Sequence, residues 1–263
     1  YENVLELRQE CVYLPAVASL NAKDYQAAVD GFSRISTYKD SADKLTQARY
    51  ALAGEKSAAG DHQAALELYT LLGSYKESES RVTAERYAAA AQKLQNGAWQ
   101  EAEEAFIALS DYKDSADQLK DAQYGQAQAL SAEGKYDAAI ALFTELGDYK
   151  KSSTELQKNQ YLKAGELLTA KKWDEAEALY AALGNYSDSA TRYKAAVYGQ
   201  AEAALAAGNR EQALTLFDGL GDYSDAADRA KECRYMEAAE LAAAGKAQEA
   251  AERFAALGNY SDA

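Results

Sequence analysis

The sequence predicts an all-α protein built from stacked antiparallel helix pairs, an α-solenoid. One tyrosine position recurs every 37 residues, and a period between 20 and 50 residues is typical of stacked units that cannot bury their apolar faces alone. Residues that favour helix are abundant, and Pro15 is the single proline. The recurring tyrosines are Tyr1, Tyr38, Tyr75, Tyr112, Tyr149, Tyr186, Tyr223 and Tyr260.

The period divides the chain into a single repeat array over residues 1–263. Because 48% of the residues are apolar, stacked units can bury a continuous core. The seven predicted units are 1–37, 38–74, 75–111, 112–148, 149–185, 186–222 and 223–259, and a partial unit covers 260–263.

The first helix of each unit is predicted from its start signal and its apolar stripe. In the second unit, Asp40 and Ser41 are residues that accept hydrogen bonds from the free N–H groups of a helix start. Gly60 ends the pattern, so we expect a helix of about 18 residues over 41–58. The stripe at helical spacing is Ala42, Leu45, Ala48 and Leu52.

The second helix of the same unit starts near Asp61 and is amphipathic. Gly73 follows it, at the place where a residue with positive φ ends a helix. The connections are short, which predicts that the two helices pack antiparallel. Its apolar face is Ala65, Leu68, Tyr69 and Leu72.

Four aligned positions predict the core. Where every copy carries alanine, we expect two backbones to approach closely; where every copy carries a large residue, we expect burial. The alanines are Ala16, Ala53, Ala90, Ala127, Ala164, Ala201 and Ala238 in the first helices and Ala28, Ala65, Ala102, Ala139, Ala176, Ala213 and Ala250 in the second. The large residues are Phe32, Tyr69, Phe106, Phe143, Tyr180, Phe217 and Phe254, with Ile35, Leu72, Leu109, Leu146, Leu183, Leu220 and Leu257 three positions later.

Charge and composition exclude several classes of function. A net charge of −14 disfavours nucleic acid as a partner, because its phosphates would be repelled. The sequence contains no run of 18 apolar residues, so we expect no insertion into a membrane. We expect no cofactor, no metal and no catalytic residue: His62 stands where sister units carry Tyr25, Trp99 or Tyr136, which predicts a packing role. The sequence does not indicate a compartment.

Two smaller features of the sequence concern charge and cysteine. The unit 149–185 is the only one with a positive charge; its lysines form either a solvated face or a contact site for an acidic group. Cys11 and Cys233 share one repeat position with Ala48 and Ala122. Six units separate them, so we predict no disulfide and expect both to be buried small residues.

Several units carry a glycine, a large residue two positions later, an alanine three after that, an aromatic residue four further on, and a leucine three beyond it: Gly134, Tyr136, Ala139, Phe143 and Leu146; Gly97, Trp99, Ala102, Phe106 and Leu109; and Gly60, His62, Ala65, Tyr69 and Leu72. These units resemble the tetratricopeptide repeat (TPR), in a 37-residue variant with a Tyr-x-Asp-Ser motif. The resemblance covers the whole chain, but the period exceeds the family's usual 34 residues, and the motif replaces its closing proline. It implies a right-handed α-solenoid, and this variant looks like bacterial arrays that serve as protein-binding scaffolds.

One tyrosine per unit in the first helix is the candidate partner-binding set. The resemblance implies that this position faces a concave groove, where tyrosine would offer apolar area and a hydrogen-bonding tip. The alternative is structural: each ring packs on the adjacent unit and its hydroxyl bonds a backbone group. The candidate residues are Tyr50, Tyr87, Tyr124, Tyr161 and Tyr198.

The favoured function is therefore a non-enzymatic scaffold that binds a peptide or protein along a concave groove. The alternative is a structural protein that stacks end to end into filaments, because neither end of the sequence resembles a polar capping repeat. The same two ends are also expected if the chain is a piece of a longer array. Carbohydrate binding by the tyrosines is a third alternative, supported only by their number.

Overall fold

The computed structural model describes residues 2–258 and 260, and within them every regular element is an α-helix. Tyr1 and most of the predicted partial unit, 261–263, lie outside the described residues. The chain divides into two compact units, residues 1–126 and 127–263. We call them unit 1 and unit 2 and describe each by itself.

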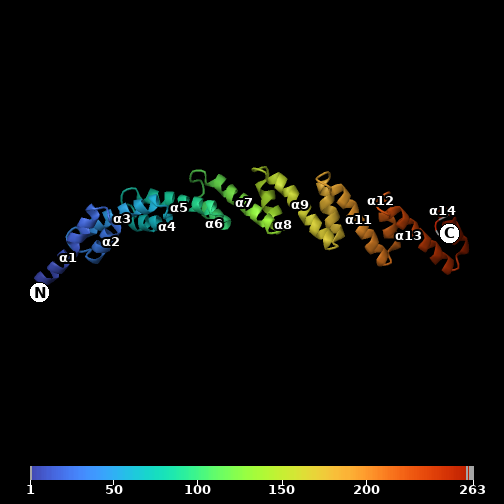
Figure 1. Ribbon diagram of the computed structural model, residues 1–263, viewed down its shortest axis with the longest axis horizontal. Helices are drawn as coiled ribbons and strands as arrows, with labels where there is room; N and C mark the ends of the chain where they lie inside the picture. Colours follow the sequence, from blue (N-terminus) through green and yellow to red (C-terminus); the bar gives the residue numbers. More distant parts are fainter. Residues whose placement is uncertain (1, 259, 261–263) are drawn as a thin grey trace. The chain divides into compact units, whose positions relative to one another are not determined.

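Unit 1 is a succession of helix pairs in which each helix packs on the next one in sequence, and Figure 1 shows this order. The boundary with unit 2 falls inside α7. The helices are α1 (Glu2–Asn21), α2 (Tyr25–Arg34), α3 (Ser41–Ala58), α4 (His62–Leu72), α5 (Ser78–Gln95), α6 (Trp99–Leu109) and α7 (Ser115–Ala132).

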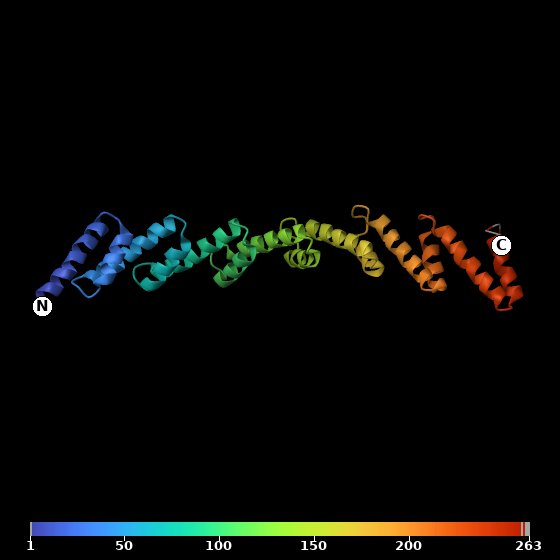
Figure 2. The same ribbon diagram turned by 60° about the horizontal axis from the view of Figure 1, so that its bottom comes forward.

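Unit 2 continues the same pattern, with consecutive helices packed against each other from α8 to α14 (Figure 2). Longer and shorter helices alternate, as in a helical-repeat solenoid, so the predicted all-α solenoid class is confirmed. The helices are α8 (Tyr136–Leu146), α9 (Ser152–Thr169), α10 (Trp173–Leu183), α11 (Ser189–Ala206), α12 (Arg210–Leu220), α13 (Ala226–Ala243) and α14 (Ala247–Leu257).

The helix limits follow from local chemistry. α3 spans Ser41–Ala58, as the apolar stripe predicts, and α4 begins after Asp61, whose carboxylate accepts a hydrogen bond from the Ala64 N–H. Gly73 has φ of 54°, a backbone conformation that side chains disfavour, and this ends α4.

The predicted role of Asp40 as a hydrogen-bonding cap is wrong. Asp40 precedes α3, but its carboxylate accepts no hydrogen bond from the helix start. It accepts one from the Tyr13 hydroxyl instead, at 2.7 Å. Nor does Ser41 cap the helix: it is buried, and in three sister copies the serine hydroxyl donates to the carbonyl oxygen of the preceding tyrosine. The motif therefore connects helices rather than capping one.

The predicted core is confirmed at the alanine positions, all of which are buried. The second-helix aromatic residues are also buried from Phe32 to Phe217, whereas Phe254 in α14 is only half-buried. The leucine position is less uniform, since Leu72, Leu109 and Leu146 are half-buried. Each buried large side chain contributes about 1.5–3 kcal/mol before entropy is subtracted.

The prediction that both cysteines are buried holds only for Cys233. Cys11, in α1, is exposed. Cys233, at the same repeat position in α13, is 2% exposed and belongs to a cluster with Phe217 and Ala230.

Candidate partner-binding surface

The candidate tyrosines lie half-buried on the first helix of each pair, where their rings join three elements. Each ring meets the aromatic residue of its own second helix and the loop tyrosine that follows, edge to face in most pairs and with centroids 5.5–6.2 Å apart. The pairs are Tyr50 with Tyr69 and Tyr75, Tyr87 with Phe106 and Tyr112, Tyr161 with Tyr180 and Tyr186, and Tyr198 with Phe217 and Tyr223.

These contacts place the rings at the joint between successive helix pairs. Tyr124 occupies the equivalent position in α7 and is also half-buried. We call this arrangement the tyrosine joint: a first-helix tyrosine, the second-helix aromatic residue and the loop tyrosine. It explains physically why every copy keeps tyrosine, since the ring fills the joint while its hydroxyl reaches the surface.

In the Tyr87 and Tyr161 joints, the hydroxyl donates to the aspartate of the next Tyr-x-Asp-Ser motif, not to a backbone group as the structural alternative expected. Tyr161 donates to Asp188 at 2.5 Å, and Tyr87 donates to Asp114. The Asp114 carboxylate raises the pKa of Tyr87 to about 12. The same hydrogen bond lowers the pKa of Asp114, because it stabilises the charged carboxylate.

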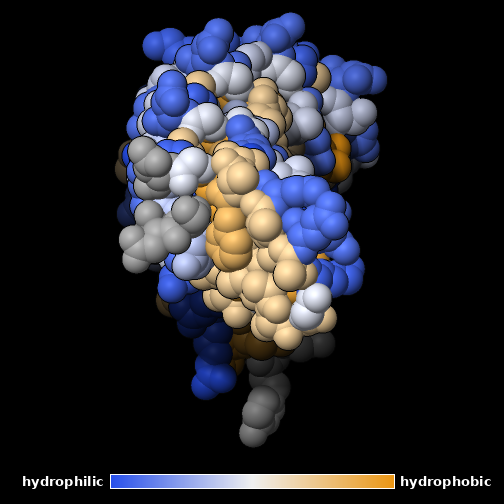
Figure 3. All heavy atoms as spheres, turned by 90° about the vertical axis from the view of Figure 1, so that its right-hand side faces the viewer, coloured by the Kyte–Doolittle hydropathy of each residue, from blue (hydrophilic) through white to orange (hydrophobic). Residues whose placement is uncertain are grey.

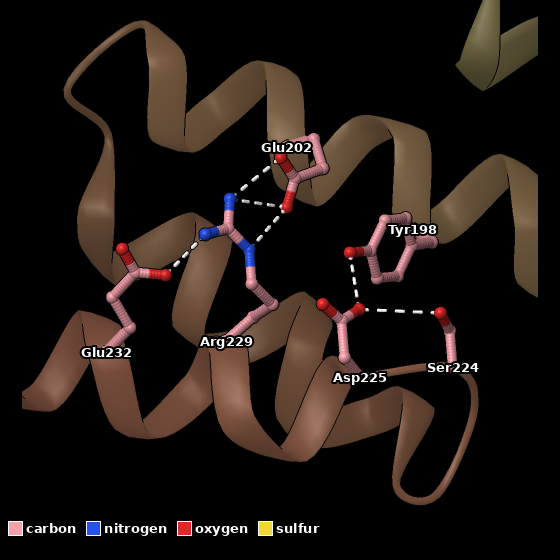
Figure 4. Close-up of polar contacts among 6 residues, drawn as sticks. All are labelled: Tyr198, Glu202, Ser224, Asp225, Arg229 and Glu232. Atoms are coloured by element: carbon pink, nitrogen blue, oxygen red, sulfur yellow. Dashed lines mark hydrogen bonds and ion pairs between the residues drawn. The ribbon is translucent and has the colours of Figure 1, made fainter.

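Figure 4 shows the polar contacts around Tyr198 in unit 2, where charged groups lie beside the tyrosine and its aspartate. Tyr198 donates to Asp225 at 2.6 Å, and Ser224 donates to the same carboxylate at 3.4 Å. Beside them, Arg229 binds Glu202 through two hydrogen bonds of 2.7 and 2.8 Å and also pairs with Glu232. Burial and the Asp225 hydrogen bond raise the pKa of Tyr198 to about 12.

Cations lie over the aromatic rings of these joints. In unit 1, the Lys39 ammonium lies 4.9 Å from the Tyr13 ring centroid, and the Lys76 ammonium lies 4.7 Å from that of Tyr50. Both distances allow an attraction between the cation and the ring quadrupole. Lys39 and Lys76 also have φ of 49°, so each lysine occupies a left-handed turn position.

A buried polar cluster distinguishes one seam of unit 1. Glu85 is 3% exposed and stands where sister copies carry Ala48 or Ala122. It accepts a hydrogen bond from Ser57 at 2.6 Å, and His62 Nδ1 lies 2.8 Å from its other oxygen. His62 therefore contacts a carboxylate, although the sequence predicts only a packing role. The departure from alanine at residue 85 is the sequence signal that marks this cluster.

An open hollow of about 560 Å³ lies between α3, α4 and the start of α5, next to Tyr50. Gly54 and Ser57 line it from α3, Tyr69 from α4 and Arg81 from α5. Of the predicted site residues, Tyr50 is the one that lines this hollow. Sequence reasoning did not single out Arg81, because arginine on a helix surface carries no distinguishing pattern.

Two further hollows lie in unit 2, each between the turn of one helix pair and the first helix of the next. One, of about 450 Å³, is lined by Lys135, Lys163 and Lys172, but Lys163 pairs with Asp137 and Lys172 lies 3.3 Å from Glu175. Two of the three lysines of this hollow are therefore paired with carboxylates. The other, of about 660 Å³, is lined by Arg210, Glu237, Glu240 and the buried Cys233, among others.

The described residues offer no metal centre, since His, Cys, Asp and Glu nowhere gather in a group of three or more that could hold an ion. None of the helices in the described part of the chain is long and apolar enough to cross a membrane. No protein-family model matches this sequence, and neither does any curated protein.

Proposed function

We propose that this chain is a non-enzymatic interaction scaffold that binds a peptide or protein partner in a groove along the first helices of successive repeats. The hollow beside Tyr50 carries the proposal, because it is open to solvent and lined by aromatic, hydroxyl and guanidinium groups. Tyrosine and arginine are enriched at sites that contribute most to protein binding.

The contrast between core and surface supports the same function. Alanines and aromatic residues repeat in the buried framework, whereas the three hollows have different linings: tyrosine and arginine beside α3, lysines beside α8, and a mixture of arginine and glutamate beside α12. A constant framework that presents variable surfaces is suited to recognition, and it requires no reactive group.

The test is capture of peptides from a displayed random-peptide library by the immobilised chain. Gly54→Leu fills the hollow from an exposed helical position where an added Cβ would make only ordinary contact, at 3.8 Å from the Tyr69 hydroxyl. We expect the unmodified chain to enrich a peptide family at micromolar concentration and Gly54→Leu to lose it. The control is Gly219→Leu in α12, where an added Cβ has no neighbour within 4 Å. No enrichment by the unmodified chain would contradict the proposal.

End-to-end self-association is the second candidate, and exposed apolar side chains favour it. On α1, Leu5, Leu7 and Leu14 are 61%, 65% and 57% exposed. On α14, Phe254 is half-buried, although Phe217 at the same repeat position is fully buried. Figure 3 shows apolar surface across the end of unit 2 that carries α14. Apolar faces of this kind mark sites of association.

Sedimentation velocity across a hundredfold range of concentration tests this second candidate. Stacking predicts that the sedimentation coefficient rises with concentration and that Leu7→Glu together with Leu14→Glu abolishes the rise. The matched control is Leu71→Glu in α4, another exposed leucine that lies away from α1. A concentration-independent monomer would contradict self-association and leave groove binding unaffected.

A further inference from the structure

In four copies of the tyrosine joint, the tyrosine hydroxyl donates a hydrogen bond to an aspartate carboxylate. Tyr161 and Asp188 show the arrangement most fully, because the Arg192 guanidinium also donates to the Asp188 carboxylate, at 2.9 and 3.0 Å. The joint of this copy is thus a carboxylate held by a phenol and a guanidinium. The other pairs are Tyr13 with Asp40, Tyr87 with Asp114 and Tyr198 with Asp225.

The joint of Tyr50 has the same donors but lacks the carboxylate. Its motif carries Glu77 in place of aspartate, and the Glu77 side chain is 71% exposed. Arg81 corresponds to Arg192, but it lies 3.8 Å from Glu77 and is 51% exposed. Within the described part of the chain, the Tyr50 hydroxyl has no hydrogen-bond partner.

The second-helix residue adds a third donor. Tyr69 and Tyr180 carry hydroxyls where most sister copies have phenylalanine, and each faces a glycine of the first helix. An added Cβ at Gly54 would lie 3.8 Å from the Tyr69 hydroxyl, and one at Gly165 would lie 3.7 Å from that of Tyr180. Gly54 therefore leaves the Tyr69 hydroxyl accessible from the hollow.

The hollow is thus a carboxylate site whose internal ligand has been removed. We propose that it binds the side-chain carboxylate of an aspartate or glutamate in a partner peptide, which takes the place that Asp188 holds in the sister joint. Tyr50, Tyr69 and Arg81 are the donors. This inference rests on the proposed groove-binding function and specifies one subsite of that groove.

The surrounding charges are compatible with an anion at this place. Arg81 lines the hollow, and a second cation, the Lys76 ammonium, lies 4.7 Å from the centroid of the Tyr50 ring. Glu77 is exposed to solvent, which screens its charge. Glu85 is buried behind the hollow, and Ser57 and His62 hold its two oxygens. A guanidinium and a phenol together give strong, charge-assisted hydrogen bonds to a carboxylate.

The experiment is an NMR titration of the full chain with three capped peptides. The first, acetyl-Gly-Gly-Glu-Gly-Gly-amide, carries one side-chain carboxylate, and the second has Gln in place of Glu. The third, acetyl-Gly-Gly-Gln-Gly-Gly with a free C-terminus, separates a terminal carboxylate from a side-chain one. The signals followed are the Gly54 backbone N–H and the Arg81 Nε–H.

We expect the Glu peptide to shift both signals saturably and the Gln amide peptide to leave them unchanged. Glu77→Asp restores the internal ligand of the sister joints and should weaken the binding of the Glu peptide at least tenfold. Asp188→Ala empties the sister joint and should create matching shifts at Gly165. Arg81→Gln should also weaken binding at least tenfold, and unchanged helical circular dichroism would show that the variants are folded.

Equal binding of the Glu and Gln amide peptides would overturn the inference, as would an unchanged affinity in Glu77→Asp. Stronger binding of the free C-terminal peptide than of the Glu peptide would overturn the assignment to a side chain. A failure of the proposed groove-binding function can be told apart from a failure of this carboxylate subsite. In the first case the short Glu peptide still binds at Tyr50, but the displayed library yields no partner.

Discussion

Two tyrosine joints, that of Tyr50 in unit 1 and that of Tyr161 in unit 2, hold a cation over the same ring but supply it from different places in the sequence. In unit 1, the cation is a loop lysine such as Lys76, 4.7 Å from the Tyr50 ring centroid. In the Tyr161 joint of unit 2, Ser187 occupies that loop position, and Arg192 of α11 lies 5.3 Å from the Tyr161 ring centroid. Both loop residues have φ near 50°, so the backbone is the same.

This difference teaches that the joint constrains an interaction and not a residue. In an alignment of the copies, the change from Lys76 to Ser187 looks like the loss of a positive charge. Arg192, five residues after Ser187, nevertheless places a positive charge over the Tyr161 ring. The guanidinium also binds the joint's Asp188, which a loop lysine does not do in the Lys39 joint, where Lys39 pairs with Glu10. The buried framework, by contrast, is alike in both units.

The strongest way to break this comparison is to overpack the shared framework. Ala139 in α8 and Ala65 in α4 are fully buried at the same repeat position. We expect Ala139→Leu and Ala65→Leu each to lower the free energy of unfolding by about 1–3 kcal/mol, because neither site has room for the added atoms. Thermal unfolding followed by circular dichroism measures the effect. An unchanged melting temperature in either variant would contradict the view that both units share a close-packed framework.

The indole and glycine pairs offer a second test that spans both units. The Trp99 ring lies on Gly125, and the Trp173 ring lies on Gly199, so that an added Cβ would come within 2.6 Å of either ring. Glycine to alanine in a helix normally stabilises by about 1 kcal/mol, but here we expect Gly125→Ala and Gly199→Ala to destabilise by about 1–3 kcal/mol. Gly219→Ala, with open space around it, is the control and should stabilise.

The buried cluster of unit 1 has no counterpart among the alanine copies, and its removal should sharpen the comparison. His62→Tyr with Glu85→Ala installs residues that sister copies carry and removes a buried charge. We expect a gain of about 1–2 kcal/mol in the free energy of unfolding, because apolar replacements of buried ionic groups are often stabilising. Urea denaturation measures it. A loss of stability would show that the cluster is needed to hold α3 to α5.

Moving the cation within one joint tests the comparison directly. Arg192→Ala should lower the free energy of unfolding by about 0.5–1 kcal/mol, the usual size of an exposed cation–ring interaction. Adding Ser187→Lys to that variant transfers the unit 1 arrangement and should recover part of the loss. The matched control is Ser224→Lys alone, where Arg229 stays in place. No recovery by Ser187→Lys would mean that the two cation positions are not equivalent.

The smallest expected effect is a change in the pH dependence of stability. The Tyr87 hydroxyl lowers the pKa of Asp114, so this pair stabilises the fold above the ordinary aspartate pKa, and the stabilisation is lost as pH falls through the lowered value. Tyr87 itself has its pKa raised to about 12, so its contribution is complete below about pH 10 and is lost as pH rises towards 12.

Tyr87→Phe should therefore flatten both limbs of a profile of melting temperature against pH. Tyr50→Phe is the matched control, because the Tyr50 hydroxyl has no aspartate partner in its joint, and this variant should leave both limbs unchanged. Equal profiles for the unmodified chain and Tyr87→Phe would contradict the proposed contribution of the tyrosine–aspartate hydrogen bond.

The sequence by itself determined the helices and most of the core. The stripe from Ala42 to Leu52 predicts α3 to its observed limits, and the copies of Ala65 and Phe106 mark positions that are buried. These features depend on contacts between residues three or four apart and on repetition, both of which are legible in a linear pattern. Gly73 likewise shows where α4 ends, because few other residues tolerate its φ.

Only the tertiary structure decided which polar groups meet. Asp40 precedes a helix and has the composition of a cap, but its carboxylate bonds Tyr13 from 27 residues away. Glu85 meets Ser57 and His62 through three different helices, and Cys11 is exposed although its copy at Cys233 is buried. Such partners depend on how whole helices pack. The spacing of residues along the sequence predicts the helices and the core, but it does not show which polar side chains meet.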